Sequence, residues 1–331
     1  MGILLQIQSL NGRLAHAVRR NVLTYCPQTV TATIMNTHAT RRTFLKTSAL
    51  AAAGIALPHP ALFAAKPGDE MRLGLVTYLW GKDWDLPTLI ANCEKAKVLG
   101  IELRTQHAHG VEPTLSRAKR AEVKKRFDDS EAVCLGYGSN EQFDDPDPAK
   151  VKQAIENTRA FLQLSHDIGG SGVKVKPNRF HEGVPHEKTL TQIGKALIEV
   201  GRIADKLGQE IRLEVHGTGT QELVNIKKIM DVADHPSIGV CWNCNPEDLN
   251  GQGLEHNFNL VKKRFGRTVH VRELNDESYP YQQLMDLLVK MDYKGWVLLE
   301  CRTEPEDKVT AMIEQRKLFE KMVKVGQKNM K

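Results

Sequence analysis

Four residues in the second half of the chain have the types and the spacing of a metal-dependent catalytic site. They are separated by 29, 27 and 30 residues, and each follows a short, mostly apolar run: Glu214, Asn243, His270 and Glu300. Two carboxylates, an amide oxygen and an imidazole suit a hard or borderline divalent cation such as Mg²⁺, Mn²⁺, Co²⁺ or Zn²⁺. Such a site needs a repeating structural unit that delivers one of these side chains each time.

That unit is a strand-like run followed by an amphipathic, helix-like run, and it occurs eight times. Alternating strands and helices indicate a parallel sheet, and eight units in about 250 residues have the size of a closed barrel. The alternative is an open doubly wound sheet, but no Gly-x-Gly-x-x-Gly follows the first strand, where TYLWGKDW stands. We predict an α/β fold, a single-domain (β/α)8 TIM barrel. The expected strands are 71–78, 100–105, 132–138, 172–177, 210–217, 237–243, 267–274 and 295–301, and the expected helices are 86–99, 114–129, 148–168, 187–207, 220–233, 254–265, 281–292 and 306–323.

Polar and apolar residues alternate within these strands, as in Arg212, Leu213, Glu214 and Val215. Side chains alternate between the two faces of a strand. A helix follows every strand and covers the outer face, so the polar set is expected to point into the barrel. Catalytic groups of such barrels come from the carboxyl ends of the strands. The four candidate ligands, on strands five to eight, should therefore converge at one side of the mouth.

Four motifs at the strand ends carry a family resemblance: IELRTQHAHG, LEVHG, VHVRE and LLE. Over essentially 71–323, the sequence resembles the sugar phosphate isomerase/epimerase family of xylose isomerase-like TIM barrels. In ketose 3-epimerases of this group, strands five to eight supply a Glu, an Asp, a His and a Glu to one divalent metal, and the two Glu residues also form the acid/base pair. The resemblance thus implies Glu214, Asn243, His270 and Glu300 as metal ligands, with Glu214 and Glu300 as the catalytic pair.

The implied reaction removes a weakly acidic proton from a carbon beside a carbonyl group. A metal would polarise the carbonyl and stabilise the enediolate, while carboxylates on opposite faces of the sugar take and return the proton. Basic side chains could hold a carboxylate, phosphate or hydroxyl group of the substrate. The predicted substrate-binding residues are Glu102, Arg104, His107, His109, Lys174, Lys176, His216 and Arg272. Glu102 and Arg104 could instead form an ion pair with each other.

The sequence departs from the family pattern at Asn243, where an Asp is expected, and at Pro246, where a His often follows. A neutral amide removes one negative charge and weakens metal affinity, and Lys176 could repel a cation. A divalent metal, Mn, Mg, Co or Zn, is nevertheless the expected cofactor. Cys241 and Cys244 flank this position in a Cys-x-x-Cys spacing, but strand alternation would turn them to opposite sides. We predict neither a zinc clamp nor a redox pair there.

The first 65 residues have a different composition from the rest. The segment TRRTFLKTSALAAAGIALP, from Thr40 to Pro58, resembles a twin-arginine (Tat) export signal. We expect a disordered upstream extension at 1–34, a signal peptide at 35–65 and the barrel domain at 66–331. The resemblance implies the Tat translocase as a partner during export, and an exported, periplasmic or extracellular protein with no membrane segment in its mature form.

The charge balance of the chain after residue 65 gives no support to a nucleic-acid or anionic-membrane partner. Six of the 46 Lys and Arg residues lie in 1–65, which holds no Asp or Glu, so 40 basic residues face 40 acidic ones in the remainder. This balance offers no argument for nucleic acid or an anionic membrane. Five cysteines remain there, an odd number that does not suit a disulfide framework. The expected partner is a small-molecule sugar or glycoside. The sequence leaves open whether the protein forms a homo-oligomer.

The main functional hypothesis is a sugar isomerase or epimerase that uses metal-assisted proton abstraction. One alternative is a lyase or hydrolase of 3-keto-glycosides with the same enolate-stabilising site; export favours it, because phosphorylated sugars are mostly cytoplasmic. Another is a catalytically inactive sugar-binding barrel, which Asn243 supports. A DNA-repair endonuclease on the same fold is disfavoured by the neutral barrel domain and by the lack of additional His and Asp ligands.

Overall fold

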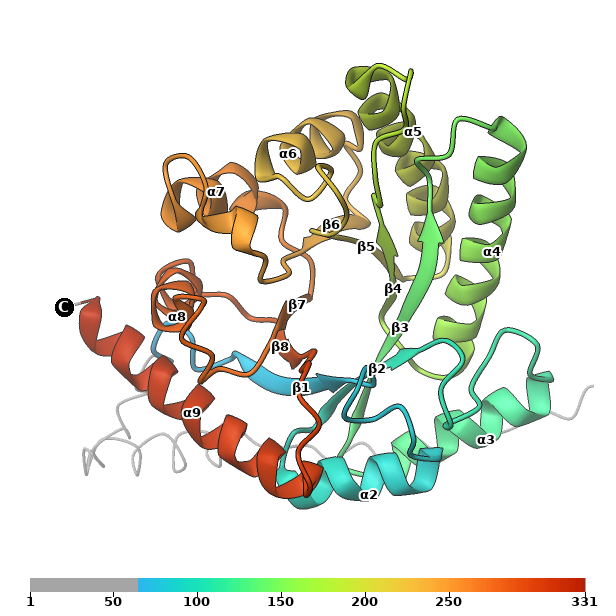
Figure 1. Cartoon of the computed structure of the whole chain (residues 1–331). Coiled ribbons are helices and arrows are strands. Elements are labelled where there is room, and N and C mark those ends of the chain that lie inside the picture. Colours follow the sequence, from blue (N-terminus) through green and yellow to red (C-terminus); the bar gives the residue numbers. More distant parts are fainter. Residues whose placement is uncertain (1–64, 331) are drawn as a thin grey trace, which may run out of the picture. The chain divides into compact units, whose positions relative to one another are not determined.

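The repeating strand–helix units fold into a barrel of parallel strands surrounded by helices (Figure 1). The computed structural model describes residues 65–330. The expected signal peptide, apart from Ala65, and the expected upstream extension lie outside these residues. The strands are β1 (Arg72–Val76), β2 (Gly100–Arg104), β3 (Val133–Gln142), β4 (Gly172–Lys176), β5 (Glu210–Glu214), β6 (Ile238–Cys241), β7 (Thr268–Val271) and β8 (Trp296–Leu299). The helices are α2 (Leu86–Ala96), α3 (Arg117–Asp128), α4 (Pro148–Asp167), α5 (His186–Lys206), α6 (Leu223–Val232), α7 (Leu254–Val261), α8 (Tyr281–Lys290) and α9 (Lys308–Asn329), with 3-10 turns η1 (Pro246–Leu249) and η2 (Lys262–Arg264).

The eight strands hydrogen-bond in the order β6-β5-β4-β3-β2-β1-β8-β7. The ring closes between β6 and β7 through two isolated parallel bridges, Val240 with Phe265 and Asn243 with His270. At the second bridge the His270 N–H donates to the Trp242 carbonyl at 2.7 Å. The predicted (β/α)8 barrel is thus confirmed, with a seam that has little regular strand pairing.

Aspartates start three of the surrounding helices, and on α5 a regular apolar stripe holds the helix against the barrel. Asp85 accepts from Thr88 N–H at 2.9 Å at the start of α2, and Asp147 and Asp307 cap α4 and α9 in the same way. Such caps satisfy backbone donors that the first turn leaves free. On α5 the buried residues recur at helical spacing, and burying each large aliphatic side chain stabilises the fold by about 1.5–3 kcal/mol. They include Leu190, Ile193, Leu197 and Val200.

The alternation predicted for the strands is present. Outward residues such as Val173 and Leu213 are buried in the layer beneath the helices, and the inward Lys174 is equally buried but faces polar partners. At the amino-terminal end of the barrel, Arg212 donates to the Leu135 carbonyl, to Ser171 Oγ and to Glu210. These bonds give Arg212 a full set of partners at the end of the barrel away from the mouth.

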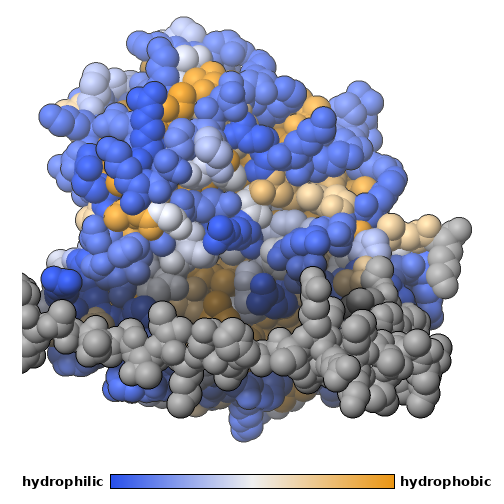
Figure 2. All heavy atoms as spheres, turned by 180° about the vertical axis from the view of Figure 1, so that it is seen from behind, coloured by the Kyte–Doolittle hydropathy of each residue, from blue (hydrophilic) through white to orange (hydrophobic). Residues whose placement is uncertain are grey.

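Two elements run further than the sequence indicated. Strand β3 extends to Gln142, past the expected end at residue 138, and α9 extends to Asn329, past residue 323. None of the helices within residues 65–330 has the length and hydropathy needed to cross a membrane. Figure 2 shows a surface on which hydrophilic side chains predominate and apolar ones form small groups.

Candidate active site

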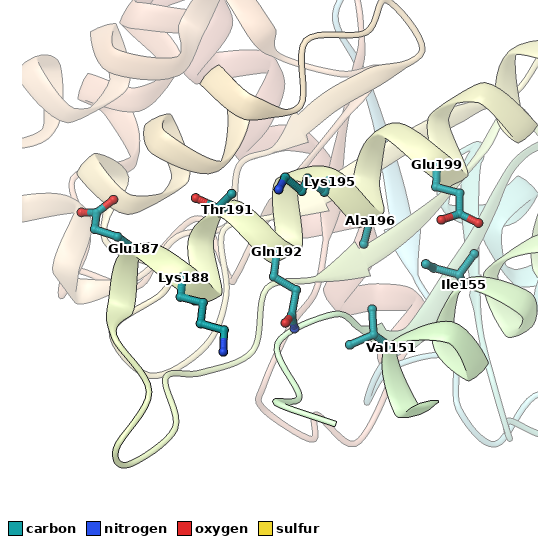
Figure 3. A pocket seen from close by; sticks show the side chains of 9 residues that line it. All are labelled: Val151, Ile155, Glu187, Lys188, Thr191, Gln192, Lys195, Ala196 and Glu199. Carbon is teal, nitrogen blue, oxygen red and sulfur yellow. The ribbon is translucent and has the colours of Figure 1, made fainter. Parts of the chain in front are cut away.

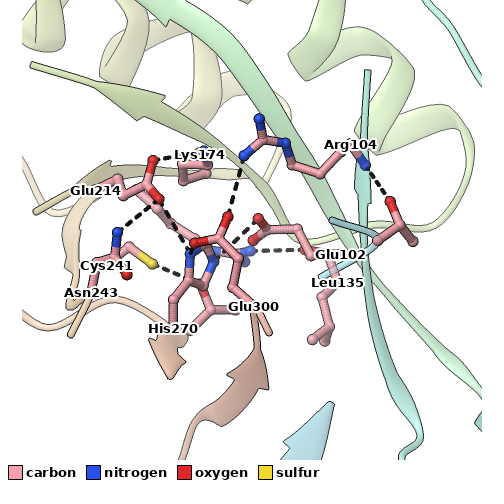
Figure 4. A network of polar contacts seen from close by, with 12 residues as sticks. Glu102, Arg104, Leu135, Lys174, Glu214, Cys241, Asn243, His270 and Glu300 are labelled. Carbon is pink, nitrogen blue, oxygen red and sulfur yellow. Dashed lines mark hydrogen bonds and ion pairs between the residues drawn. The ribbon is translucent and has the colours of Figure 1, made fainter. Parts of the chain in front are cut away.

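Three of the predicted ligands meet at the carboxyl end of the barrel (Figure 4). Glu214 ends β5, His270 lies on β7 and Glu300 follows β8, and one ligand atom from each lies within 4.8 Å of the others. His270 Nδ1 is 3.4 Å from Glu214 Oε1 and 3.7 Å from Glu300 Oε2. All three side chains are buried. The convergence expected from the strand spacing is therefore what the structure shows for these residues.

A divalent cation fits this group. His270 Nδ1 is buried, faces two carboxylates and has no hydrogen bond of acceptable geometry within the described chain. A buried polar atom without a partner is costly, and coordination to an ion would satisfy it. Nitrogen and carboxylate oxygen donors suit Zn²⁺, Mn²⁺ or Co²⁺ better than they suit Ca²⁺. Glu214, His270 and Glu300 are thus the residues that would hold the metal.

Glu102 supports His270 from the side opposite the metal ligands. Its Oε1 lies 3.2 Å from His270 Nε2, and both side chains are fully buried. Burial alone would raise the pKa of Glu102, but the neighbouring His270 and Lys174 outweigh it and lower the pKa. A carboxylate on the second ring nitrogen fixes the tautomer and the ring orientation of a metal-binding histidine. The structure thus pairs Glu102 with His270 and not with Arg104, while contact between Glu102 and a substrate stays a prediction.

Asn243 lies beside Glu214 and uses its amide as a donor. Its Nδ2 donates to Glu214 Oε1 at 3.3 Å, and the side chain is buried. To present its oxygen to an ion, the amide would have to turn and give up this bond. Asn243 as a fourth ligand stays a prediction.

Lys174 occupies the other oxygen of Glu214. The Lys174 ammonium is fully buried and lies 2.7 Å from Glu214 Oε2. Burial would raise the pKa of Glu214, but the Lys174 charge and the His270 contact hold it well below its usual range. Glu214 is thereby kept ionised and able to bind a cation. Lys174 was predicted to bind substrate, whereas here it binds a predicted metal ligand.

Gly138 on β3 provides the space for these long side chains, and the sequence analysis did not identify it. A Cβ atom at this position would lie 2.8 Å from Glu102 Oε1, 2.8 Å from Arg104 Cδ and 3.4 Å from Lys174 Cε. The only available signal was a glycine inside a strand, which often marks close packing by a neighbouring group.

Arg104 and Lys176 form the partly buried rim of the site on the β2 to β4 side. Arg104 Nη1 contacts Glu300 Oε1 at 3.3 Å, while Nη2 donates to Asn140 Oδ1 at 3.1 Å. Lys176 Nζ reaches the same Asn140 oxygen at 3.3 Å. Burial and the nearby Lys174 charge lower the pKa of Lys176 to about 8. Two cations therefore share one neutral acceptor at the mouth.

The remaining predicted substrate contacts divide into two groups. His109 is buried, and its ring nitrogens bond the Arg104 carbonyl and the Val111 N–H, so it holds its own loop; its contact with a substrate stays a prediction. His107 bonds Thr77 Oγ1, and burial lowers its pKa to about 4, so it is neutral at pH 7. His216 and Arg272 are half-buried, and each has a buried side-chain nitrogen with no hydrogen-bond partner among the described residues. These two stay candidates for substrate contact.

The cysteines near the site do not form a metal clamp. Cys241 and Cys244 are buried and free, and no disulfide occurs among the described residues. Burial raises the pKa of both thiols. The Cys244 Sγ bonds the His270 carbonyl, whereas Cys241 lies near the His270 ring. That the Cys-x-x-Cys spacing is neither a zinc site nor a redox pair stays a prediction.

A separate groove lies on the outer wall between α4 and α5 (Figure 3). Val151, Ile155 and Ala196 give it an apolar floor, and Lys195 and Glu199 stand at its edge. None of its residues belongs to the cluster at the mouth. We therefore assign the chemistry to the mouth of the barrel.

Residues 90–322 match the profile of the family described as xylose isomerase-like TIM barrel. The chain belongs to this family. Because the match covers seven of the eight strands, it includes every residue of the site at the mouth. Membership in this family establishes the fold.

Individual relatives are distant. Inosose dehydratase 2 of Bacillus cereus is 22% identical over 200 residues, which is 47% of this chain and 66% of that protein. The match thus spans just under two thirds of this curated relative. Among solved structures, an L-ribulose 3-epimerase has a TM-score of 0.68 at 14% identity, covering 78% of this chain and 97% of its own. The IOLI protein with a bound zinc atom has a TM-score of 0.65 at 15% identity, covering 77% and 99%. At these identities the structural matches show the fold.

Proposed function

We propose that this protein is a sugar isomerase or epimerase that removes and returns a proton beside a carbonyl group. The observation that carries the proposal is the pair of buried carboxylates in the mouth, Glu214 and Glu300, which lie 3.4 and 3.7 Å from the same His270 Nδ1. Burial would raise the pKa of both carboxylates, yet both pKa values are lowered. Lys174 and His270 lower the pKa of Glu214. His270 lowers the pKa of Glu300, against the opposing effect of the nearby Glu214 charge. Ionised carboxylates at these positions can act as general bases and, once protonated, as general acids.

A divalent cation bound by Glu214, His270 and Glu300 would polarise the carbonyl and stabilise negative charge on its oxygen. The chain's own residues do the remaining work. One carboxylate takes the C–H proton and one returns it, either at the neighbouring carbon for isomerisation or on the opposite face for epimerisation. Arg104 orients Glu300, and Lys174 orients Glu214. The likeness to an L-ribulose 3-epimerase supports this assignment.

A lyase is the second candidate, and the similarity to inosose dehydratase favours it. The same enolate can expel a leaving group from the β-carbon instead of being reprotonated, which would cleave a 3-keto-glycoside or eliminate water. Both reactions begin with the same proton abstraction, so Glu214 and Glu300 serve either one.

The deciding experiment is incubation of the purified protein with Mn²⁺ and a substrate panel in deuterium oxide. The panel holds free ketoses, aldoses and 3-keto-glycosides. We expect deuterium to enter a carbon beside the carbonyl of a free sugar, detected by NMR and mass spectrometry, without glycoside cleavage. Cleavage or loss of water would support the lyase instead. No exchange into any compound would contradict both enzymatic assignments and leave a sugar-binding barrel.

Glu214→Gln and Glu300→Gln provide the matched variants. Each keeps the size of the side chain and removes the base, so exchange should fall about 10²-fold or more. An exposed carboxylate outside the site, Glu199→Gln on α5, is the control and should leave exchange unchanged. Equal exchange by all variants would contradict the assigned roles.

A further inference from the structure

The charges in the mouth do not balance once a divalent cation is present. Three carboxylates and three cationic side chains surround the site: Glu102, Glu214, Glu300, Arg104, Lys174 and Lys176. With His270 neutral, as a metal-binding imidazole must be, their formal charges sum to zero. A family member with an Asp at position 243 would have one more negative charge, but Asn243 is neutral. Adding a divalent cation therefore leaves about two positive charges in a largely buried volume, an arrangement that needs compensation.

The structure also shows where that compensation can bind. Arg104 Nη2 and Lys176 Nζ both point at one oxygen of Asn140, at 3.1 and 3.3 Å. Asn140 is exposed and neutral, so its oxygen accepts hydrogen bonds from both side chains but does not neutralise either positive charge. No carboxylate within the described residues pairs with Lys176. An anionic group that replaces the Asn140 oxygen would meet a guanidinium and an ammonium at once.

The anion subsite lies close to the reacting carbon. The same guanidinium that faces Asn140 also contacts Glu300, at 3.3 Å through Nη1. The anionic group and the carbon beside Glu300 must therefore belong to one monosaccharide unit. A charge on a distant part of a glycoside could not reach both.

We propose that the substrate is a carboxylate-bearing monosaccharide, a sugar acid, and that Arg104 and Lys176 bind its carboxylate. This inference rests on the proposed function. One carboxylate neutralises one of the two excess charges. Transfer of the C–H proton to Glu214 or Glu300 moves a negative charge from that carboxylate to the substrate and leaves the sum unchanged, so one positive charge remains to stabilise the enediolate. A phosphate dianion would use both charges before the reaction begins. The sugar acid and the divalent cation should consequently bind cooperatively, each raising the affinity for the other.

The test measures Mn²⁺ binding to the full chain by isothermal titration calorimetry in the presence of saturating sugars. The panel consists of hexuronates, each paired with its neutral hexose and its hexose 6-phosphate, and acetate serves as a free carboxylate. We expect at least one hexuronate to lower the Kd for Mn²⁺ by about tenfold or more, while its neutral hexose changes it less than about twofold. If no hexuronate differs from its neutral partner, or only phosphates do, the proposal is overturned.

Variants locate the effect. Lys176→Met should abolish the hexuronate effect and leave Mn²⁺ binding without sugar equal or tighter, because one repelling charge is gone. Lys176→Gln should behave in the same way and guards against a folding defect of the first variant. Lys195→Met on the outer wall is the control and should keep the full effect (Figure 3). Retention of the effect in both Lys176 variants would overturn the subsite.

The deuterium exchange assay separates this inference from the proposed function. If neutral hexoses exchange with a kcat/KM as high as that of the hexuronates, the sugar-acid inference is wrong and the isomerase assignment stands. If hexuronates tighten Mn²⁺ binding but no sugar exchanges, the subsite is supported and the isomerase assignment is wrong.

Discussion

The ammonium of Lys174 contacts Glu214, one of the three residues that would bind the metal. With Asn243 on Oε1 and Lys174 on Oε2, both oxygens of this carboxylate already have N–H donors. A metal must share Glu214 with these donors or displace them. Removing one partner of a buried ion pair costs about 3–5 kcal/mol because it leaves a buried charge alone, so Lys174 stabilises the protein when no metal is bound.

Lys174→Met should therefore have opposite effects on stability and on metal affinity. Without metal, we expect the free energy of unfolding to fall by about 3 kcal/mol. With the competing cation gone, Mn²⁺ should bind about tenfold more tightly or better, and saturating Mn²⁺ should restore much of the lost stability. Calorimetric titration and thermal unfolding with and without Mn²⁺ measure both. Weaker Mn²⁺ binding by the variant would contradict competition; Lys188→Met, on the outer wall, is the control.

At the level of single residues, the sequence predicted which side chains face the mouth but not all of their partners. Residue type and strand spacing were enough for Glu214, His270 and Glu300. Glu102 and Arg104 share an inward face, and the sequence allowed a pair between them, whereas the structure pairs Glu102 with His270 and Arg104 with Glu300. Alternation along a strand predicts the face from which a side chain projects. Which partner that side chain contacts depends on its depth in the barrel and on its rotamer.

Among the strands, β3 contributes to the site by lacking a side chain at Gly138. Gly138→Ala would place a methyl group 2.8 Å from Glu102 Oε1 and Arg104 Cδ. These are ends or middles of long side chains, so we expect them to move rather than the backbone, at a cost of about 1–3 kcal/mol. Mn²⁺ affinity and deuterium exchange should both fall, because Glu102 holds His270 and Arg104 holds Glu300.

Gly208→Ala is the contrasting variant. Gly208 has a φ of +63° and no atom within 4 Å of an added Cβ, so alanine there strains the backbone without touching the site. It should lower stability by about 1 kcal/mol and leave metal binding unchanged. If Gly138→Ala behaves in the same way as Gly208→Ala, Gly138 does not shape the site.

The short η1 turn contains a carboxyl group that should make stability depend on pH. Asp248 accepts from Asn245 N–H and from Tyr279 O–H, at 3.0 and 2.8 Å, yet burial raises its pKa from 3.8 to about 7. The folded state then binds more protons than the unfolded state between these two values, so this group lowers the free energy of unfolding as pH rises from 3.8 to about 7.

Asp248→Asn should remove this contribution and keep an acceptor oxygen for both donors. We expect a flatter pH dependence of stability between pH 4 and 7, and a more stable protein at pH 8, measured by urea unfolding at a series of pH values. Asp234→Asn is the control, since the Asp234 side chain is 95% exposed. An unchanged slope in Asp248→Asn would contradict the raised pKa.

The elements themselves were largely predictable. Alternating runs placed all eight strands and the helices that follow them, and caps such as Asp85 and Asp307 mark helix starts in the sequence. The ends of the strands and helices were harder to predict because tertiary packing sets them. Strand β3, for example, continues to pair with β4 as far as Gln142 after a register shift. No local sequence pattern encodes that shift.

On the scale of the whole molecule, the leader is proposed to direct export of an already folded barrel. Arg41 and Arg42 lie outside the described residues, and the Tat motif is recognised by a receptor as a short sequence. Replacing both with Lys should therefore retain the protein inside the cell without changing its deuterium exchange activity or stability. Cell fractionation followed by immunoblotting measures this. Unchanged export of the double variant would contradict the assignment; Lys46→Arg, which keeps the positive charge at another position of the motif, is the control.

The seam between β6 and β7 couples the candidate site to the rigidity of the barrel. One of the two bridges that close the ring joins Asn243 to His270, and Glu214 ends the strand on the far side of β6. A ligand that pulls His270 and Glu214 together also pulls β7 toward β5 across this joint. We therefore expect a bound ligand to make the barrel more rigid between β6 and β7, where backbone pairing is sparsest. Without a ligand, this part of the barrel should be more mobile.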